Sequence, residues 1–425
     1  MRKTVLIITY YWPPAGGPGV QRWLKFVKYL PTYGVKPIVY CPENPSYPIV
    51  DEQLLVEVPE GVEVVKHPIK EPYGWASMLG KKRSQSISSG VIPNAKRQSL
   101  IDKLLLFVRG NFFIPDARKD WVKPSVAFLK EFLSTRHIDT IITTGPPHSL
   151  HLIGMQLKEA LGVKWIADFR DPWTTIGYHK KLKLTKSAER KHLQLESKVL
   201  QSADYLVVTS YKTQEEFQAK TQVPIKVITN GYDVYHLPPQ EKDSQFTIAH
   251  IGSLLSDRNP KQLWEALYEL TQEHPEFASL FRLKLIGVVS EAIIDQLNAI
   301  GLMPYVELVG YVGHTDAIAA QQQSRILLLI EIDSEETKGI IPGKLFEYMS
   351  SETPILAVGP EGSDVEQLIK TTNTGCYFGY NDKALIKSQI LSYFEAYKAN
   401  TLETHPIGLQ QYSRQQLTKA LTDLL

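Results

Sequence analysis

Lys344 and Glu347 place an ammonium and a carboxylate three residues apart, a spacing that puts both on one face of a helix. Lys344 follows an apolar strand predicted at 326–330 and a loop that ends at Gly343. A lysine binds phosphate as a point charge, and a carboxylate accepts hydrogen bonds from neighbouring sugar hydroxyls. Open α/β sheets bind nucleotides at such strand-to-helix junctions. The spacing therefore indicates a phosphate and sugar site, with an ordinary ion pair between Lys344 and Glu347 as the alternative.

Three further residues in the same half of the chain have side chains or backbone suited to phosphate. Gly252 and Ser253 end a predicted strand at 246–251, and Arg258 lies a few residues further on. Because the strands of one parallel sheet end at the same edge, we expect Arg258 and Lys344 to converge on a diphosphate.

Two short loops complete the predicted nucleotide site. The first loop begins with a glycine, and its backbone offers a flat surface for a nucleobase. The second loop leads directly into the helix of Lys344. The residues are Gly310, Tyr311 and Val312 in the first loop and Ile341, Pro342 and Gly343 in the second. A plain turn is the alternative for each loop, and their order along one half favours a common site.

The elements that position these residues alternate between strand and helix in both halves. This alternation predicts two parallel sheets, each covered on both faces. A polar, proline-bearing linker at 238–244 separates the halves, and residues 77–100 are expected to form a mobile insertion. Strands are predicted at 4–9, 37–41, 140–143, 164–167, 205–209, 246–251, 284–286, 326–330 and 354–358, and helices at 20–30, 150–161 and 185–201.

Composition limits the class of protein. The 425 residues are enough for two domains, and 43% hydrophobic with 22% charged residues is typical of a soluble globular protein. Cys41 and Cys376 are the only cysteines, which excludes a disulfide framework and a cysteine zinc site and fits a reducing cytoplasm. The apolar run at 5–8 is too short for a signal peptide or a membrane span. We therefore expect a cytoplasmic protein.

Charge is distributed unevenly although the net charge is only +2. Residues 1–235 hold 33 Lys and Arg against 21 Asp and Glu, whereas residues 236–425 hold 14 against 24. The basic half is expected to face something anionic, such as a membrane surface or a phosphorylated acceptor. Nucleic acid is not expected, because the chain contains no recognised reader motif.

A glycine loop near the N-terminus partly fits the dinucleotide fingerprint. Gly17 and Gly19 occupy the first two glycine positions, but Arg22 stands at the third, where a bulky side chain obstructs helix–strand packing. Glu43 resembles the ribose-binding acid, which leaves NAD binding as one alternative. The other is a loop in which the backbone N–H groups of Gly16 and Gly17 approach a phosphate or sugar of the donor.

Taken together, these motifs resemble the group-1 family of retaining glycosyltransferases, glycosyltransferase family 4, and most closely the members that build bacterial surface polysaccharides. The likeness extends over nearly the whole chain. It rests on Gly16, Gly17, 168–173, 203–204, Ser210, 230–233, Gly252, 309–311, 344–348 and 353–355.

The resemblance implies the α/β GT-B fold, in which two Rossmann-like parallel-sheet domains face each other across a cleft. Residues 1–235 are expected to bind the acceptor, and residues 236–404 a nucleotide sugar such as a UDP- or GDP-sugar. Residues 405–425 are expected to form the part that returns to the first domain, with a final helix at 413–425.

The chain departs from the family pattern at two donor positions. The family commonly has a glutamate that contacts the transferred sugar eight residues before Glu347, and here that residue is Gly339. Ser253 stands where an arginine is frequent, which leaves Arg258 and Lys344 as the phosphate pair. The diphosphate and the ribose are therefore better predicted than the sugar.

Three residues of the first half are candidate catalytic residues on the acceptor side. Some relatives have a histidine at the position of Arg170, but arginine cannot act as a base, so Arg170 is expected to bind phosphate or to position Asp171. Asp171 is the candidate for orienting the acceptor hydroxyl, with a helix or turn cap as the alternative. His148 is a third candidate and His151 a further pocket residue, although a lone histidine is more often structural.

The resemblance also implies the reaction. A sugar passes from a nucleoside diphosphate to a hydroxyl of a glycan or lipid-linked acceptor with retention of configuration, without cofactor, metal ion or protein nucleophile. Two alternatives stay open. One is a GT-B nucleotide-sugar epimerase or hydrolase, and the other is a non-catalytic partner subunit that binds the nucleotide sugar.

Contact with a membrane is a separate hypothesis. Basic residues at 81–83 and 96–97 accompany the apolar stretch 104–113, a mixture that suits an anionic bilayer surface. The chain is then expected to lie peripherally on the inner face of the membrane. A core helix with solvated loops is the alternative.

Overall fold

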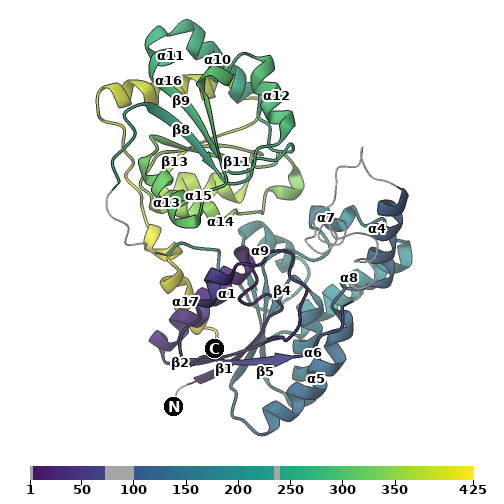
Figure 1. The fold of residues 1–425 in the computed structure, drawn as a ribbon. Coiled ribbons are helices and arrows are strands. Elements are labelled where there is room, and N and C mark those ends of the chain that lie inside the picture. The colour runs from purple at the N-terminus through teal and green to yellow at the C-terminus, as the bar shows by residue number, and fades with distance from the viewer. Residues whose placement is uncertain (1–2, 72–99, 234–239) are drawn as a thin grey trace. The chain divides into compact units, whose positions relative to one another are not determined.

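The computed structural model describes residues 3–71, 100–233 and 240–425 (Figure 1). Contacts divide the chain into one compact unit of Met1–Asn230 with Arg414–Leu425 and a second of Gly231–Ser413. The sequence-based division after residues 235 and 404 stays a prediction. Residues 77–99 of the expected mobile insertion lie outside the described residues.

The first unit contains a seven-stranded parallel sheet in the order β3-β2-β1-β4-β5-β6-β7. In its register, Val5 lies beside Pro37 on one side and Thr140 on the other. The strands are β1 (Lys3–Ile8), β2 (Val35–Pro42), β3 (Glu63–His67), β4 (Thr140–Gly145), β5 (Lys164–Phe169), β6 (Tyr205–Val208) and β7 (Ile225–Val227). The helices are α1 (Pro18–Tyr29), α4 (Leu100–Phe112), α5 (Lys119–Ser134), α6 (Ser149–Leu161), α7 (Gly177–Lys180), α8 (Lys186–Ser202), α9 (Tyr211–Gln218) and α17 (Arg414–Thr422).

The central strand β1 shows why this sheet needs helices on both faces. Successive side chains of a strand point to opposite faces, and all of those from Val5 to Ile8 are buried. Leu6 and Ile8 pack in a core with α5 and α6, while Val5 and Ile7 pack in another with α1 and α17. The continuous apolar run of the strand is the pattern expected of a doubly covered parallel sheet.

Asp168 links α1 to the centre of this sheet. Its buried carboxylate accepts hydrogen bonds from Arg22 Nη2 at 2.8 Å, Trp23 Nε1 at 2.9 Å and Thr144 Oγ1 at 2.8 Å. Arg22 also donates to the carbonyl of Thr229 at 2.8 Å. The side chain at the third fingerprint position is therefore buried and ion-paired, in a place where dinucleotide-binding folds require glycine.

The final helix α17 packs against α1 in the first unit (Figure 1). Leu417 and Leu421 are buried in the core that α1 covers, and Arg414 Nη1 donates to the carbonyl of Gln21 at 2.9 Å. The predicted terminal helix at 413–425 is thus present from Arg414 to Thr422.

The second unit contains a six-stranded parallel sheet in the order β10-β9-β8-β11-β12-β13. Leu328 and Ile330 pack with α10, α12 and α16, and Leu327 and Leu329 on the opposite face are also fully buried. The strands are β8 (Phe246–Ile251), β9 (Phe281–Ile286), β10 (Val306–Gly310), β11 (Ile326–Ile330), β12 (Ile355–Val358) and β13 (Gly375–Phe378). The helices are α10 (Lys261–Glu273), α11 (Pro275–Leu280), α12 (Glu291–Ala299), α13 (His314–Gln323), α14 (Gly343–Ser350), α15 (Asp364–Thr372) and α16 (Lys383–Lys398).

Two parallel, helix-covered sheets were predicted, and the structure confirms them. The sequence missed the outer strands β3, β7, β10 and β13, and it placed Gly310 in a loop although this residue belongs to β10. Outer strands have a neighbour on one side only, so their residues are partly exposed and lack a long apolar run. Among the described residues no helix is both long and apolar enough to cross a bilayer.

Replacing Asp168 with alanine is expected to destabilise the first unit by about 3–5 kcal/mol, because it leaves the buried guanidinium of Arg22 without a counter-ion. Urea denaturation followed by tryptophan fluorescence measures the change. The control is Glu215→Ala, which removes an exposed ion pair with Lys212 and should cost less than about 1 kcal/mol. Equal effects of the two substitutions would contradict a structural role for Asp168.

Candidate functional site

Three glycines mark the carboxyl ends of β8, β9 and β10 in the second unit. Gly252, Gly287 and Gly310 have φ values of +113°, +121° and +81°, which favour glycine. Gly252 N donates to Ile286 O at 2.7 Å, and Gly287 N donates to Gly310 O at 2.7 Å. A Cβ atom on Gly287 would lie 2.7 Å from the carbonyl oxygen of Gly252. The sequence predicted two of these glycines and missed Gly287, which joins their loops.

The carboxyl ends of β8 and β11 form the switch point of the second sheet. The chain leaves β8 toward β9 on one side, and β11 lies on the other side. Ligands of open α/β sheets bind outside the strand ends at this point. The eight-residue helix α14 starts after β11 at Gly343, with no side-chain cap and no acidic residue in its first turn. The N-terminal end of its helix dipole therefore adds to the positive potential of the site.

Lys344 lies in the first turn of α14 and extends to the end of β8. Its Nζ donates to Ile251 O at 3.0 Å and lies 3.3 Å from His250 Nε2. A Cβ atom on Gly252 would be only 3.5 Å from the same Nζ. Burial, with the charge of Arg258 as the second cause, lowers the pKa of Lys344 to about 7.

Arg258 follows β8 and brings a second cation to this place. Its charge lowers the pKa values of both Lys344 and His250. Within the described residues neither Arg258 nor Lys344 has an ion-pair partner, and the buried Nε of Arg258 has no hydrogen-bond acceptor. Two neighbouring cations without a counter-ion form a site for an anionic ligand.

Glu347 is held by α13 and does not pair with Lys344. Its Oε1 lies 3.2 Å from His314 Nε2, and its Oε2 accepts from Gln321 Nε2 at 3.3 Å. The predicted alternative of an ion pair between Lys344 and Glu347 is therefore wrong. Carboxylate oxygens accept more than one hydrogen bond each, so this arrangement leaves acceptor capacity for a ligand.

The other predicted donor residues lie around this centre. Gly310 ends β10, and Tyr311 and Val312 follow it, with Tyr311 87% exposed. Ser253 is exposed directly after Gly252. The buried Ile341 and the partly buried Pro342 precede α14, and the partly buried Gly343, which was predicted to end the loop, is the first residue of the helix.

Glu331, at the end of β11, was missed as a site residue. Its Oε2 accepts from Tyr377 OH at 2.6 Å and from Ser363 Oγ at 3.1 Å, while its buried Oε1 has no hydrogen-bond partner in the described part of the chain. Burial raises the pKa of Glu331 to about 7, although Arg258 opposes this shift. Tyr377 and Gly359 separate this carboxylate from a surface pocket of about 350 Å³. The signal in the sequence was an acidic residue placed directly after an apolar strand.

In the first unit, Arg170 lies against the start of α1. Its guanidinium lies so close to Gly19 that a Cβ atom there would be 1.5 Å from Nη1. Arg170 also donates to the carbonyl of Pro146 and lies 5.9 Å from the centroid of the Tyr11 ring. Gly16 packs against Ile49 in the loop that follows β2, and Gly16 N donates to the carbonyl of Ile49 at 3.0 Å. The missing side chain of Gly19, in the first turn of α1, therefore leaves room for a cation at the helix start.

Asp171 is partly buried and makes no hydrogen bond with any described residue. The predicted alternative of a helix or turn cap is therefore not observed in the described structure. Burial raises the pKa of Asp171, and the neighbouring Arg170 opposes this shift.

His148 and His151 lie in a buried aromatic cluster. The ring of His148 stacks on Trp173 with centroids 5.1 Å apart, and neither of its nitrogens has a hydrogen-bond partner among the residues that the structure describes. His151 Nδ1 lies 2.9 Å from the hydroxyl of Thr143 and its ring stacks on Phe169. Burial lowers the pKa of His148 well below its usual value and that of His151 to about 3. Both rings are neutral near pH 7, and a catalytic role for His148 stays a prediction.

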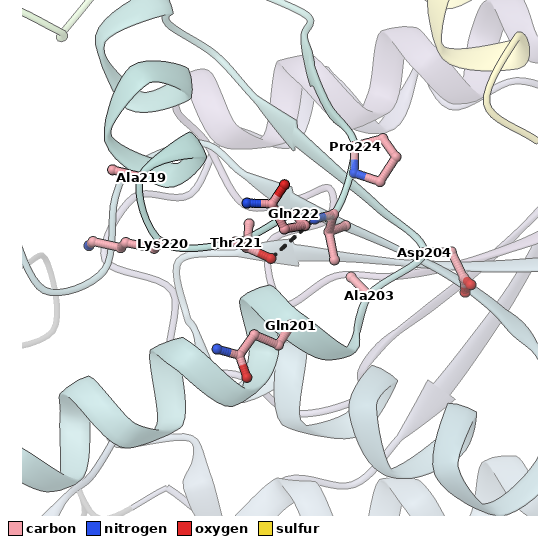
Figure 2. A pocket seen from close by; sticks show the side chains of 9 residues that line it. Gln201, Ala203, Asp204, Ala219, Lys220, Thr221, Gln222 and Pro224 are labelled. Atoms are coloured by element: carbon pink, nitrogen blue, oxygen red, sulfur yellow. Dashed lines mark hydrogen bonds between the residues drawn. The ribbon is translucent and has the colours of Figure 1, made fainter.

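A larger surface pocket, of about 660 Å³, lies in the first unit near the amino ends of β6 and β7 (Figure 2). Its lining includes Asp204 directly before β6 and Pro224 directly before β7, so it faces the amino ends of these strands. Asp204 pairs with Lys158 at 2.8 Å, and Lys220 pairs with Glu196 at 3.0 Å. Its charged groups are paired within the protein, so this pocket is not the candidate site. No three His, Cys, Asp or Glu side chains in the described ranges are grouped to hold a metal ion.

Comparison with known proteins identifies the domain that carries the cationic site. Residues 245–395, about a third of the chain, match the family model described as Glycosyl transferases group 1. Among curated proteins no sequence match was found.

Solved structures resemble the chain over its whole length. A glycosyltransferase from Rickettsia africae has 12% identity and a TM-score of 0.60, covering 100% of this chain and 97% of its own. The E. coli structure described as trehalose-6-phosphate bound with UDP-2-fluoro glucose has 10% identity and a TM-score of 0.58, with 99% of both chains covered. A putative UDP-N-acetylglucosamine 2-epimerase from Listeria monocytogenes has 12% identity and a TM-score of 0.53, covering 99% and 95%. These likenesses establish the predicted GT-B fold.

Lys344→Met is expected to change the pH dependence of stability. A pKa of about 7 in the folded state, against 10.5 for a free lysine, means that the unfolded chain binds more protons between these values. The wild type therefore gains stability as pH rises from 7 to 10.5, and the stability of Lys344→Met relative to wild type should be greater at pH 6.5 than at pH 9.5. Thermal unfolding at both pH values, with the exposed Lys261→Met as control, measures this. An identical difference at the two pH values would refute the shifted titration.

Proposed function

We propose that this protein, whose residues 245–395 match the group 1 glycosyltransferase model, is a retaining glycosyltransferase. It transfers a sugar from a nucleoside-diphosphate sugar to a hydroxyl of a glycan or lipid-linked acceptor in cell-surface polysaccharide synthesis. The observation that supports this most directly is the pair Lys344 and Arg258, two cations at the switch point of the second sheet that form no ion pair with any described residue. A diphosphate supplies the missing negative charge.

The same cations explain the chemistry. Negative charge develops on the diphosphate as the sugar leaves, and preorganised donors at that place lower the barrier. An ammonium has three N–H donors, of which Lys344 uses one for Ile251 O and one for His250 Nε2. The third is free for a phosphate oxygen. A bound diphosphate also favours the charged form of Lys344, and thereby opposes the effect of burial on its pKa.

The nucleoside is proposed to lie across the glycine loops of the second unit. Gly310, Tyr311 and Val312 form the wall for the base, and Glu347 accepts from the ribose hydroxyls while α13 holds its carboxylate. The E. coli structure with bound UDP-2-fluoro glucose supports a UDP-sugar as the first donor to test.

The acceptor is proposed to bind to the first unit. Asp171 makes no hydrogen bond with any described residue and is suited to orient the acceptor hydroxyl. Arg170, packed on Gly19 at the start of α1, is suited to a phosphate of the acceptor. The departing diphosphate assists deprotonation of the acceptor in this proposal, so neither a protein nucleophile nor a metal ion is needed.

Lys344→Ala is expected to lower kcat/KM roughly ten- to a hundredfold, because a charge-assisted hydrogen bond contributes about 1.5–3 kcal/mol. Sugar transfer from UDP- and GDP-sugars is measured in EDTA across a panel of glycan and lipid-linked acceptors. Lys261→Ala serves as the control for loss of an exposed lysine in the same unit. A wild-type rate in Lys344→Ala would refute the assignment.

The same assay separates the alternatives. The fold likeness to a putative epimerase makes donor turnover without acceptor the second candidate, and such an enzyme releases free sugar or an epimerised donor when the acceptor is omitted. Nucleotide binding without turnover on any acceptor would instead indicate a non-catalytic partner subunit.

We also propose that the first unit lies peripherally on an anionic membrane at its cytoplasmic face. Helix α4 exposes Leu104 by 61%, Phe107 by 36% and Phe112 by 62%, and the half of the chain that contains it is basic. Exposed aromatic and aliphatic side chains on a basic unit suit an interfacial position. The basic clusters at 81–83 and 96–97 lie outside the described residues.

The double substitution Leu104→Asp and Phe112→Asp is expected to reduce sedimentation with phosphatidylglycerol vesicles at low salt at least fivefold, because it puts charge on the inserting face. Leu385→Asp is the matched control, since Leu385 is 60% exposed in the acidic half of the chain. Failure of the wild type to sediment with these vesicles would end the membrane proposal.

A further inference from the structure

His250 lies in strand β8, whose other residues are apolar except for Thr247, and its side chain is completely buried. Its ring lies between two elements that border the switch point. Nδ1 lies 3.0 Å from the carbonyl oxygen of Leu328 on β11, and Nε2 lies 3.3 Å from Lys344 Nζ on α14. His250 therefore contacts both the neighbouring strand β11 and the ammonium of Lys344 in the proposed phosphate site.

These contacts determine which ring nitrogen carries the proton. A carbonyl oxygen only accepts, so Nδ1 must be the N–H that donates to Leu328 O. Burial and the charge of Lys344 lower the pKa of His250 well below its usual value, so the ring is neutral. Nε2 then has a free lone pair and accepts from the ammonium of Lys344.

We propose that His250 is a positioning residue that holds the ammonium of Lys344 at the carboxyl end of β8. Nε2 and Ile251 O together take two of its three donors and direct the third away from the sheet. Tyr348 stabilises the same carbonyl, because its hydroxyl contacts Ile251 O at 3.2 Å and accepts from Ile251 N at 2.9 Å. The charged and titratable groups around the ammonium are His250, Arg258 and Tyr348, with Glu347 one turn along α14.

Asparagine and glutamine at position 250 separate the two hydrogen bonds. The amide group of asparagine is as many bonds from Cα as Nδ1, so His250→Asn can keep the bond to Leu328 O but cannot reach Lys344. The amide of glutamine extends as far as Nε2, so His250→Gln can still offer an oxygen to Lys344 Nζ. Both variants are neutral and similar in volume, which makes them a matched pair.

Two measurements on the full-length protein test the proposal. The first is the affinity for UDP and GDP by calorimetry, which rests on the proposed function. The second is the pH dependence of Lys344 acetylation by acetic anhydride, followed by mass spectrometry, which requires no nucleotide. Thermal unfolding of each variant shows whether it is folded, and combination with Lys344→Ala completes a double-mutant cycle.

His250→Asn is expected to weaken nucleotide binding roughly tenfold, while His250→Gln stays within about threefold of wild type. Loss of the acceptor disfavours the ammonium, so the midpoint of Lys344 acetylation should fall by about one pH unit in His250→Asn only. In the Lys344→Ala background the asparagine substitution should have no further effect on affinity.

Equal acetylation midpoints in the three proteins would overturn the role of His250, whatever the nucleotide affinities are. Independent, additive effects of His250→Asn and Lys344→Ala would do the same, because a residue that only supports the fold acts without Lys344. If the wild type binds neither UDP nor GDP but the midpoint shifts in His250→Asn alone, the positioning role stands and the proposed nucleotide function fails.

Discussion

The ammonium of Lys344 is held at the switch point of the second sheet together with the guanidinium of Arg258, and no carboxylate within the described residues pairs with either. Partial burial of a cation beside a second cation is costly, and its depressed pKa reports that cost. The three glycines at the ends of β8, β9 and β10 and the uncapped start of α14 all lie at the same edge of the sheet. The ammonium has protein acceptors for two of its three N–H donors, Ile251 O and His250 Nε2. A bound anion would accept from the third.

In the first unit, by contrast, two buried charges are paired with each other. Asp168 and Arg22 are also buried, but they are paired and their hydrogen bonds tie α1 to β4 and β5. The same helix begins at a glycine loop over which the guanidinium of Arg170 lies. The buried pair holds the helix in place, and the partly exposed Arg170 and Asp171 are left for a ligand. The first unit thus separates residues that stabilise the fold from those suited to an acceptor.

Much of the architecture follows from pattern alone. The apolar runs of β1, β8 and β11 predict buried parallel strands, because a strand covered on both faces has no reason to alternate polar and apolar residues. The outer strands β3, β7, β10 and β13 escaped prediction since one neighbour is missing and their side chains are partly exposed. The spacing of Lys344 and Glu347 also indicated a site, because three residues along a helix bring two side chains to one face whatever surrounds them.

The sequence by itself determined that Lys344 starts a helix after a strand, that Gly252 ends another strand, and that Arg22 replaces a fingerprint glycine. Only the tertiary structure decided what these side chains meet. It gave Glu347 the partners His314 and Gln321 in place of Lys344, put His148 in a buried aromatic stack, and brought His250 within 3.3 Å of Lys344 across 94 residues of sequence. The physical reason is that helix and strand periodicity are local, whereas a buried hydrogen bond depends on which strands the sheet places side by side.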